Sequence, residues 1–118
     1  MEQKTAIVIG ASTGIGAATA EALAQQYKKI AITSFRHPEK LKEVQQKILA
    51  QGTDCYAETG DAGDFTFVKQ FIEHVTEHFG EKIDLLVNNA GISYVGLLTD
   101  MDETDWKRII DTNITSVF

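Results

Sequence analysis

The sequence predicts an α/β fold in which helices alternate with the strands of a parallel sheet. Short apolar runs of strand length alternate along the 118 residues with longer segments whose apolar residues recur at helical spacing. A glycine-rich turn also joins the first strand-like run to the first helical segment. This alternation is typical of βαβ units, because parallel neighbouring strands need a crossover connection and a helix usually supplies it.

The alternation predicts four strands and four helices. The strands are expected at residues 5–9, 29–34, 53–59 and 83–87. The first helix is expected to follow the glycine turn and end near Lys28, and the second to begin at Pro38 and end at Gly52. The third is expected to end at Gly80, and the fourth to begin near Asp102.

Each expected helix carries an apolar face that should pack on the sheet. The recurring apolar positions, helix by helix, are Ile15, Ala18, Ala22 and Leu23; Leu41, Val44 and Ile48; Phe67, Val68, Phe71, Ile72, Val75 and Phe79; and Trp106, Ile109, Ile110, Ile114 and Val117. No later segment of the sequence can cover the last of these faces, and a doubly wound sheet normally continues to about six strands. We therefore expect residues 1–118 to be one half of a longer single-domain protein.

The glycine-rich turn spans residues 10–16 and has the spacing G-x-x-x-G-x-G. Gly10 permits a sharp turn off the strand, Gly14 lets the backbone approach a diphosphate, and Gly16 lets the helix pack closely on the sheet. Glycines also end strands without binding a ligand, but a strand before the turn and a helix after it favour a dinucleotide site, where helix amides attract the anion. The expected cofactor-binding residues of the turn are Gly10, Ser12, Thr13, Gly14, Ile15 and Gly16.

The residues that follow the second strand indicate which dinucleotide is bound. In Rossmann-type folds an acidic residue about 20 positions after the glycines binds the ribose 2′-hydroxyl of NAD and repels the extra phosphate of NADP. Residues 33–36 are Thr-Ser-Phe-Arg and contain no acid. Arg36 offers a planar cation for a phosphate and Ser34 a hydroxyl donor, which favours NADP. The alternative is a solvated Arg36 that pairs with Glu39.

Further motifs stand where later elements end: Asp61-Ala62 after the third strand, Asn88-Asn89-Ala90-Gly91 after the fourth, and Asn113 in the last helix. Together with the glycine spacing, they resemble the short-chain dehydrogenase/reductase family, with small departures at Ile9, where threonine is usual, and at Ala62, where a larger apolar residue is common. The resemblance implies the first half of a Rossmann-type doubly wound parallel sheet with strand order 3-2-1-4. It also implies an adenine site at Asp61 and Ala62, and cofactor contacts by Asn88, Ala90 and Gly91, although the tetrapeptide taken alone could be a turn without a ligand.

Asn113 shares the apolar face of the last expected helix. A buried amide needs partners, so it either makes a structural hydrogen bond or holds an ordered water. The resemblance implies the second role and makes Asn113 catalytic, in a tetrad completed by a serine and a Tyr-x-x-x-Lys pair. The three tyrosines, Tyr27, Tyr56 and Tyr94, lack a lysine four residues later. The chain is therefore expected to bind the cofactor but to be inactive alone.

For the longer protein the resemblance implies NADPH-dependent reduction of a carbonyl to an alcohol. The motif set is most similar to that of bacterial 3-oxoacyl-(acyl-carrier-protein) reductases of fatty acid biosynthesis, which implies a small-molecule or carrier-bound ketone as substrate. A sugar, steroid or polyol dehydrogenase remains open, as does a dinucleotide-binding module without catalysis. The uncovered face of the last helix also predicts a homo-oligomer, a dimer or a tetramer.

Composition narrows the class of protein. Lys and Arg number 11 against 17 Asp and Glu, a formal charge of −6, which argues against nucleic acid as a partner. The N-terminal apolar run is far shorter than a membrane span or a signal peptide core. The single cysteine, Cys55, is expected to be a small buried side chain in a reducing compartment. We therefore expect a cytoplasmic protein without a membrane partner.

A competing motif lies in the third expected helix. Residues 74–78 fit H-x-x-E-H, a zinc motif of helices, with His74 and His78 on one side. The apolar stripe of this helix should face the sheet, and no clear partner helix offers a glutamate ligand. We therefore interpret His74 and His78 as part of a solvated helix face and expect no metal site.

Overall fold

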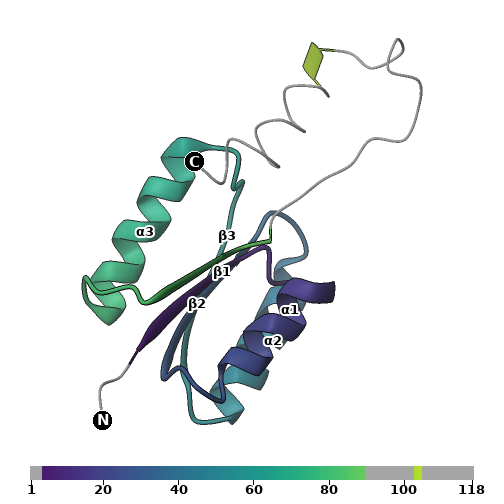
Figure 1. Ribbon diagram of the computed structural model, residues 1–118. Helices are drawn as coiled ribbons and strands as arrows, with labels where there is room; N and C mark the ends of the chain where they lie inside the picture. The colour runs from purple at the N-terminus through teal and green to yellow at the C-terminus, as the bar shows by residue number, and fades with distance from the viewer. Residues whose placement is uncertain (1–3, 90–102, 105–118) are drawn as a thin grey trace.

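The computed structural model describes residues 4–89 and 103–104. Within them a parallel sheet of four strands has the order β3-β2-β1-β4, which confirms the predicted strand order (Figure 1). The elements alternate along the chain as β1 (Thr5–Ile9), α1 (Gly14–Leu23), β2 (Lys29–Ser34), α2 (Pro38–Ala50), β3 (Asp54–Thr59), α3 (Phe65–Phe79) and β4 (Leu85–Asn88). Of the expected fourth helix only residues 103–104 are described, and they are helical, whereas its apolar face and Asn113 lie outside the described residues.

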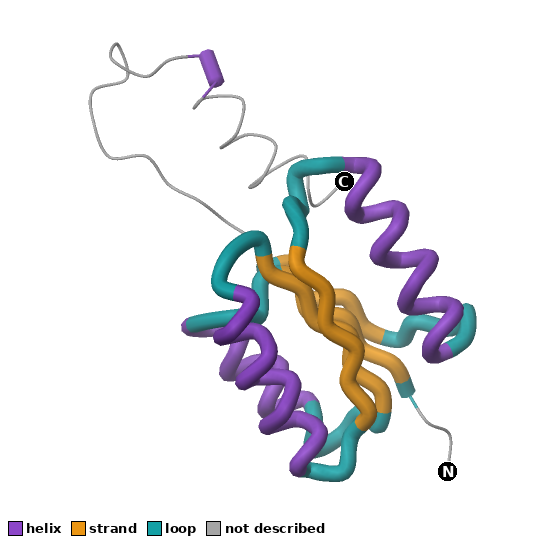
Figure 2. Tube along the Cα trace, turned by 180° about the vertical axis from the view of Figure 1, so that it is seen from behind, coloured by secondary structure: helices purple, strands orange, loops and turns teal. Residues whose placement is uncertain are grey.

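The helices form layers on both faces of the sheet. Helices α1 and α2 cover one face and α3 covers the other (Figures 1 and 2). The core on the first side includes Val8, Ile30 and Ile32, and the core on the second includes Ile7 and Phe71. Every residue of β1 is buried, because this strand lies inside the sheet and is covered on both faces.

The parallel register brings the carboxyl ends of all four strands to one edge of the sheet. Ile9 at the end of β1 pairs with Thr33 of β2 and with Asn88 of β4, and Ser34 pairs with Thr59 at the end of β3. The loops that follow these strands are therefore neighbours, and they contain the predicted cofactor-binding residues. In open α/β sheets ligands bind at this edge.

The strand bounds differ from the prediction at the amino ends of β3 and β4, and β4 also ends one residue later than predicted, at Asn88. Thr53 is buried outside β3 because its hydroxyl donates to the carbonyl of Ala24 at 2.8 Å. Asp84 precedes β4, and its carboxylate accepts the Thr5 amide at 2.9 Å. At these two positions side-chain bonds hold the backbone, and β3 begins one residue later and β4 two residues later than predicted.

The predicted buried face of α1 is wrong for three of its four residues, since only Leu23 packs against the core. Ile15, Ala18 and Ala22 are exposed, and the buried positions of the helix are Gly16 and Ala20. The helix lies so close to the end of β1 that only residues without a large side chain fit between them. In contrast, the faces of α2 and α3 are confirmed, with Leu41, Val44 and Ile48, and Phe71, Val75 and Phe79, buried.

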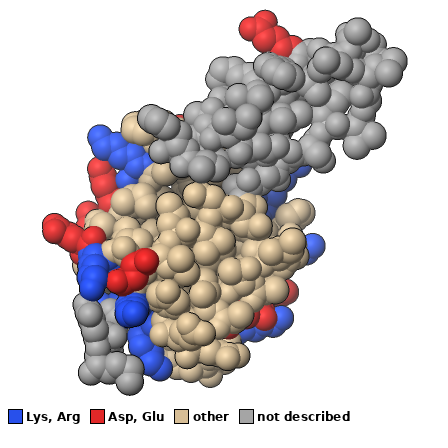
Figure 3. Space-filling view, in the orientation of Figure 1, with Lys and Arg blue, Asp and Glu red and all other residues tan. Residues whose placement is uncertain are grey.

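One face of the molecule has an area with few charged side chains. Figure 3 shows a broad uncharged area over α1 and β4, while Lys, Arg, Asp and Glu side chains gather toward the margin of this view. Two large apolar side chains of these elements are exposed, Leu86 of β4 at 50% and Ile15 of α1 at 78%. Among the described residues no helix has the length and apolar character required to cross a membrane.

Candidate functional site

Backbone hydrogen bonds join the loops that leave the four strands. The amides of Gly10 and Ala11 both donate to the Thr33 carbonyl at 2.9 Å. The Gly60 amide donates to the Ser34 carbonyl at 2.8 Å, and the Asn89 amide donates to the Ile9 carbonyl at 2.9 Å. The described residues at the ends of β1, β2, β3 and β4 thus form one connected rim, although they come from distant parts of the sequence.

The glycine turn needs its glycines for different physical reasons. Gly10 has a φ of 86° and Gly14 a φ of 60°, both in the left-handed region that L side chains rarely adopt. A Cβ built on Gly14 would meet no atom within 4 Å, so the space beside this backbone is open. A Cβ on Gly16 would instead collide with the carbonyl oxygen of Gly10. Gly16 therefore serves close packing, and Gly14 leaves room beside the backbone.

The amino end of α1 has no side-chain cap. Thr13 is its extended N-cap residue, but the hydroxyl makes no capping hydrogen bond, and the first turn holds no acid. Helix α3 provides the contrast, because the Asp64 carboxylate accepts the Thr66 amide at 2.9 Å. The first amides of α1, with the positive end of the helix dipole, are thus left to an outside partner, and an anion suits them.

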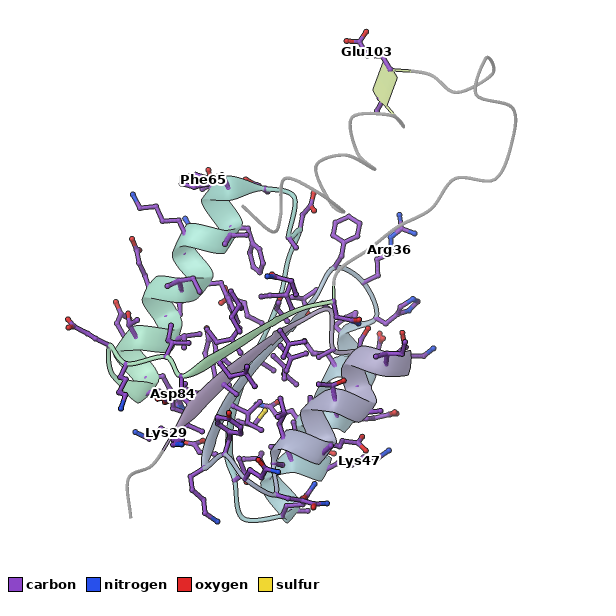
Figure 4. All side chains as sticks on the ribbon, viewed as in Figure 1. Lys29, Arg36, Lys47, Phe65, Asp84 and Glu103 are labelled. Atoms are coloured by element: carbon purple, nitrogen blue, oxygen red, sulfur yellow. The ribbon has the colours of Figure 1, made fainter. Side chains whose placement is uncertain are left out.

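The end of β2 presents Arg36 at the same edge of the sheet (Figure 4). Its guanidinium carbon lies 5.3 Å from the centre of the Phe35 ring, so the observed partner of this exposed cation is Phe35 rather than the Glu39 considered from the sequence. Ser34 is buried, and its hydroxyl donates to the Arg36 carbonyl at 2.9 Å. No carboxylate occupies residues 33–36.

The loop after β3 is compact. The Asp61 carboxylate accepts the Gly63 amide at 2.8 Å, and the Asp61 carbonyl accepts the Asp64 amide at 3.0 Å. The side chain of Ala62 is buried with the core on the α3 side. These bonds fix the backbone of the loop directly before α3.

Asn89 is a residue at this rim to which sequence reasoning assigned no role. Asn88 ends β4 and is exposed, whereas the Asn89 amide nitrogen Nδ2 donates to the Gly10 carbonyl at 3.1 Å. This bond ties β4 to the glycine turn. The adjacent asparagines were visible in the sequence, but the bond joins positions 79 residues apart and leaves no local pattern. Ala90 and Gly91 lie outside the described residues.

The histidines of the H-x-x-E-H motif are partly exposed, with 44% of the His74 and 45% of the His78 side chain accessible, and both lie beside carboxylates. His74 contacts the Glu58 carboxylate at 3.0 Å, and His78 lies 3.6 Å from that of Asp54, both on β3. The centre of the Tyr56 ring lies 6.4 Å from that of the His74 ring and 5.5 Å from that of the His78 ring. The motif joins α3 to the edge strand. Across the described ranges no three His, Cys, Asp or Glu side chains are grouped to hold a metal ion.

Two adjacent titratable side chains of β3, Cys55 and Tyr56, are held in their neutral forms. Burial first, and then the nearby Asp54 charge, raise the pKa of the Cys55 thiol to about 12. Burial and the hydrogen bond from the Tyr56 hydroxyl to Glu58 raise the pKa of Tyr56 to about 12. The predicted buried cysteine is confirmed, with 5% of its surface exposed.

His74 is expected to make the stability of the fold depend on pH. The hydrogen bond to Glu58 raises the pKa of His74 above 6.5, and the negative charges of Glu58, Glu77 and Glu73 act in the same direction, while partial burial of the ring opposes them. The stabilisation is complete below the unfolded-state pKa of about 6.5 and is lost as the pH rises through the folded-state pKa. His74→Gln should therefore cost most near about pH 6 and least near about pH 8.5.

Urea unfolding of both proteins across this pH range measures the difference, and Glu58→Gln, which removes the partner, should reproduce the same trend. A cost of His74→Gln that does not change with pH would contradict the assignment.

The chain is similar to known proteins over nearly its whole length. It is 41% identical over 115 residues to the 3-oxoacyl-(acyl-carrier-protein) reductase FabG of Staphylococcus aureus, which covers 98% of this chain and 46% of that protein. Among solved structures, a short-chain dehydrogenase/reductase from Serratia marcescens matches with a TM-score of 0.91 and 32% identity over 98% of this chain and 46% of that one. A blue fluorescent protein from a metagenomic library, in complex with NADPH, matches with a TM-score of 0.89 and 33% identity over 96% of this chain and 46% of that one.

The chain thus spans about half the length of the relatives that it matches. The model of the short chain dehydrogenase family matches residues 4–118, which includes all four strands and the glycine turn. The sheet order and the connected rim agree with this match. The chain belongs to the short-chain dehydrogenase family.

Proposed function

We propose that this chain is the cofactor-binding half of an NADPH-dependent reductase that converts a carbonyl to an alcohol, with a 3-oxoacyl compound as the substrate class. The substrate class is supported by the S. aureus relative, a 3-oxoacyl-(acyl-carrier-protein) reductase by name, at 41% identity. In this proposal residues 1–118 belong to a longer, cytoplasmic, homo-oligomeric enzyme. Its substrate is a small-molecule or carrier-bound ketone.

The observation that carries the proposal is the uncapped amino end of α1 beside the open backbone at Gly14. A dinucleotide diphosphate carries the negative charge that this end lacks, and its oxygens can accept several helix amides at once. Residues 10–16 are the proposed diphosphate site, with the Ser12 and Thr13 hydroxyls as further donors and Ile15 as an apolar contact. The open space beside the Gly14 backbone, where a Cβ would meet no atom within 4 Å, supports this assignment.

The choice of NADP over NAD is supported by Arg36 at the end of β2, where a carboxylate would be expected for NAD. The guanidinium is exposed at the rim and can form two parallel hydrogen bonds with a phosphate. The NADPH complex of the metagenomic neighbour agrees with this choice. Ser34 is assigned to the same subsite.

The remaining roles follow the order of the loops along the rim. Asp61 and Ala62 are proposed to border the adenine, and Asn88, Ala90 and Gly91 to contact the cofactor beyond β4. The bound cofactor supplies the hydride, and this chain orients it against the sheet edge. Asn113 is the proposed catalytic residue of this half, holding a water that serves in proton transfer.

Titration with NADPH tests the proposal. We expect a saturable complex with the full chain, seen as a change in nicotinamide fluorescence, and no ketone reduction, because none of Tyr27, Tyr56 and Tyr94 is followed by a lysine at the fourth position. Ketone reduction by residues 1–118 would overturn the proposal that this chain supplies only the cofactor-binding half of the enzyme. The absence of any saturable complex would overturn the proposed function itself.

A further inference from the structure

Arg36 must be held in place if it is to recognise a phosphate with selectivity. An exposed arginine has many rotamers, and fixing one of them on binding costs conformational entropy. A side chain that is oriented before the ligand arrives loses less freedom, so it binds more tightly and selects more strongly. The residues that orient Arg36 would therefore determine how well the rim distinguishes a ribose 2′-phosphate from a 2′-hydroxyl.

Phe35 supports the charged end of the side chain. The guanidinium carbon of Arg36 lies 5.3 Å from the Phe35 ring centre, inside the range of about 6 Å in which a cation is attracted to an aromatic face. Phe35 is 43% exposed although it directly follows the buried end of β2, so its ring is accessible to a neighbouring cation. A guanidinium that rests on one face of a ring keeps its edge and its N–H groups directed into solvent.

Ser34 fixes the backbone that carries both side chains. It is 4% exposed, and its hydroxyl donates to the Arg36 carbonyl at 2.9 Å. Its own carbonyl accepts the Gly60 amide at 2.8 Å, which connects this turn to the loop after β3. His37 follows with a φ of 61° and begins the change of direction into α2 at Pro38. The backbone of residues 34–37 is thereby held as a tight turn.

We propose that Ser34 and Phe35 are positioning residues that hold the Arg36 guanidinium ready for the 2′-phosphate of the cofactor. Ser34 sets the direction of the backbone, and Phe35 carries the cation on its ring. In this assignment the Ser34 hydroxyl acts through the Arg36 carbonyl rather than on the phosphate itself. The inference rests on the proposed function, because it assumes that Arg36 meets that phosphate.

The test compares two probes that differ only in the phosphate at issue, adenosine 2′,5′-bisphosphate and adenosine 5′-monophosphate. Affinities of the full chain for both are measured by calorimetry for the wild type, Phe35→Leu, Phe35→Tyr and Ser34→Ala. Phe35→Leu should weaken the bisphosphate about three- to tenfold and leave the monophosphate unchanged, because only the support of the cation is lost. Phe35→Tyr, which keeps an aromatic face, should restore the preference.

Phe65→Leu is the matched control, since Phe65 is 77% exposed at the start of α3 and should affect neither probe. Ser34→Ala should also reduce the preference for the bisphosphate. A wild type without any preference for the bisphosphate would overturn the cofactor choice in the proposed function. A preference that survives both Phe35→Leu and Ser34→Ala would overturn the positioning role alone, as would an equal loss of both probes in Phe35→Leu.

Discussion

Gly16→Ala is expected to destabilise the fold by about 3 kcal/mol, because the added methyl group has no space. Its Cβ would collide with the Gly10 carbonyl oxygen and lie 2.6 Å from Nδ2 of Asn89. Both groups belong to the backbone and hydrogen bonding of the rim, so α1 has to move away from the end of β1. The expected result is a lower urea midpoint and a weaker complex with NADPH, since the amides of α1 move with the helix.

Gly14→Ala is the control, because the same methyl group is added two residues earlier where the space is open. Only the strain of an L residue at a φ of 60° opposes it, at a cost of about 1 kcal/mol. Urea unfolding of the three proteins separates the two mechanisms. An equal cost for both variants would contradict the role of close packing at Gly16, whose φ, unlike that of Gly14, is not positive.

Arg36→Asp is expected to reverse the cofactor preference. Removal of a guanidinium that pairs with a phosphate and its replacement by a carboxylate should change the ratio of NADPH to NADH affinity by about 100-fold or more, which corresponds to about 3 kcal/mol. The new carboxylate repels the 2′-phosphate and can accept a hydrogen bond from a 2′-hydroxyl. Dissociation constants for NADPH and NADH, measured at one ionic strength, give the ratio.

Lys42→Glu provides the charge-matched control, because it makes the same change of two charges on the exposed side of α2. It should lower the affinity for both cofactors slightly and leave their ratio unchanged. If Arg36→Asp and Lys42→Glu change the ratio of NADPH to NADH affinity equally, the preference comes from the general charge of the molecule and Arg36 has no specific role.

The elements that sequence reasoning predicted best are those with a strong periodic signal. Leu41, Val44 and Ile48 recur on one side of α2 with charged residues between them, so the buried face follows from spacing alone. Helix α1 lacks such contrast, since its sequence, GIGAATAEAL, is apolar nearly all round. Of its two large apolar residues, Leu23 packs against the core, but Ile15 drew the prediction to a side that is exposed.

The candidate site shows the same division. The segments that follow the four strands could be placed at one sheet edge from the sequence, because parallel strands bring their carboxyl ends together. These segments hold the glycine turn, residues 33–36 without an acid, and the polar motifs after β3 and β4. The bond from Asn89 to Gly10, the Phe35 ring beneath Arg36 and the pairing of His74 with Glu58 could not be predicted. Each depends on the separation and orientation of two elements, which residue spacing within one element does not encode.

The sequence by itself determined the order of strands and helices, the position of the glycine turn and the family resemblance, because these depend on local conformational preference and on periodicity along one segment. Only the tertiary structure decided which side of α1 is buried, which asparagine braces the turn and what supports Arg36. The physical reason is that close packing and hydrogen bonds act between atoms brought near each other by the sheet, whatever their separation along the chain.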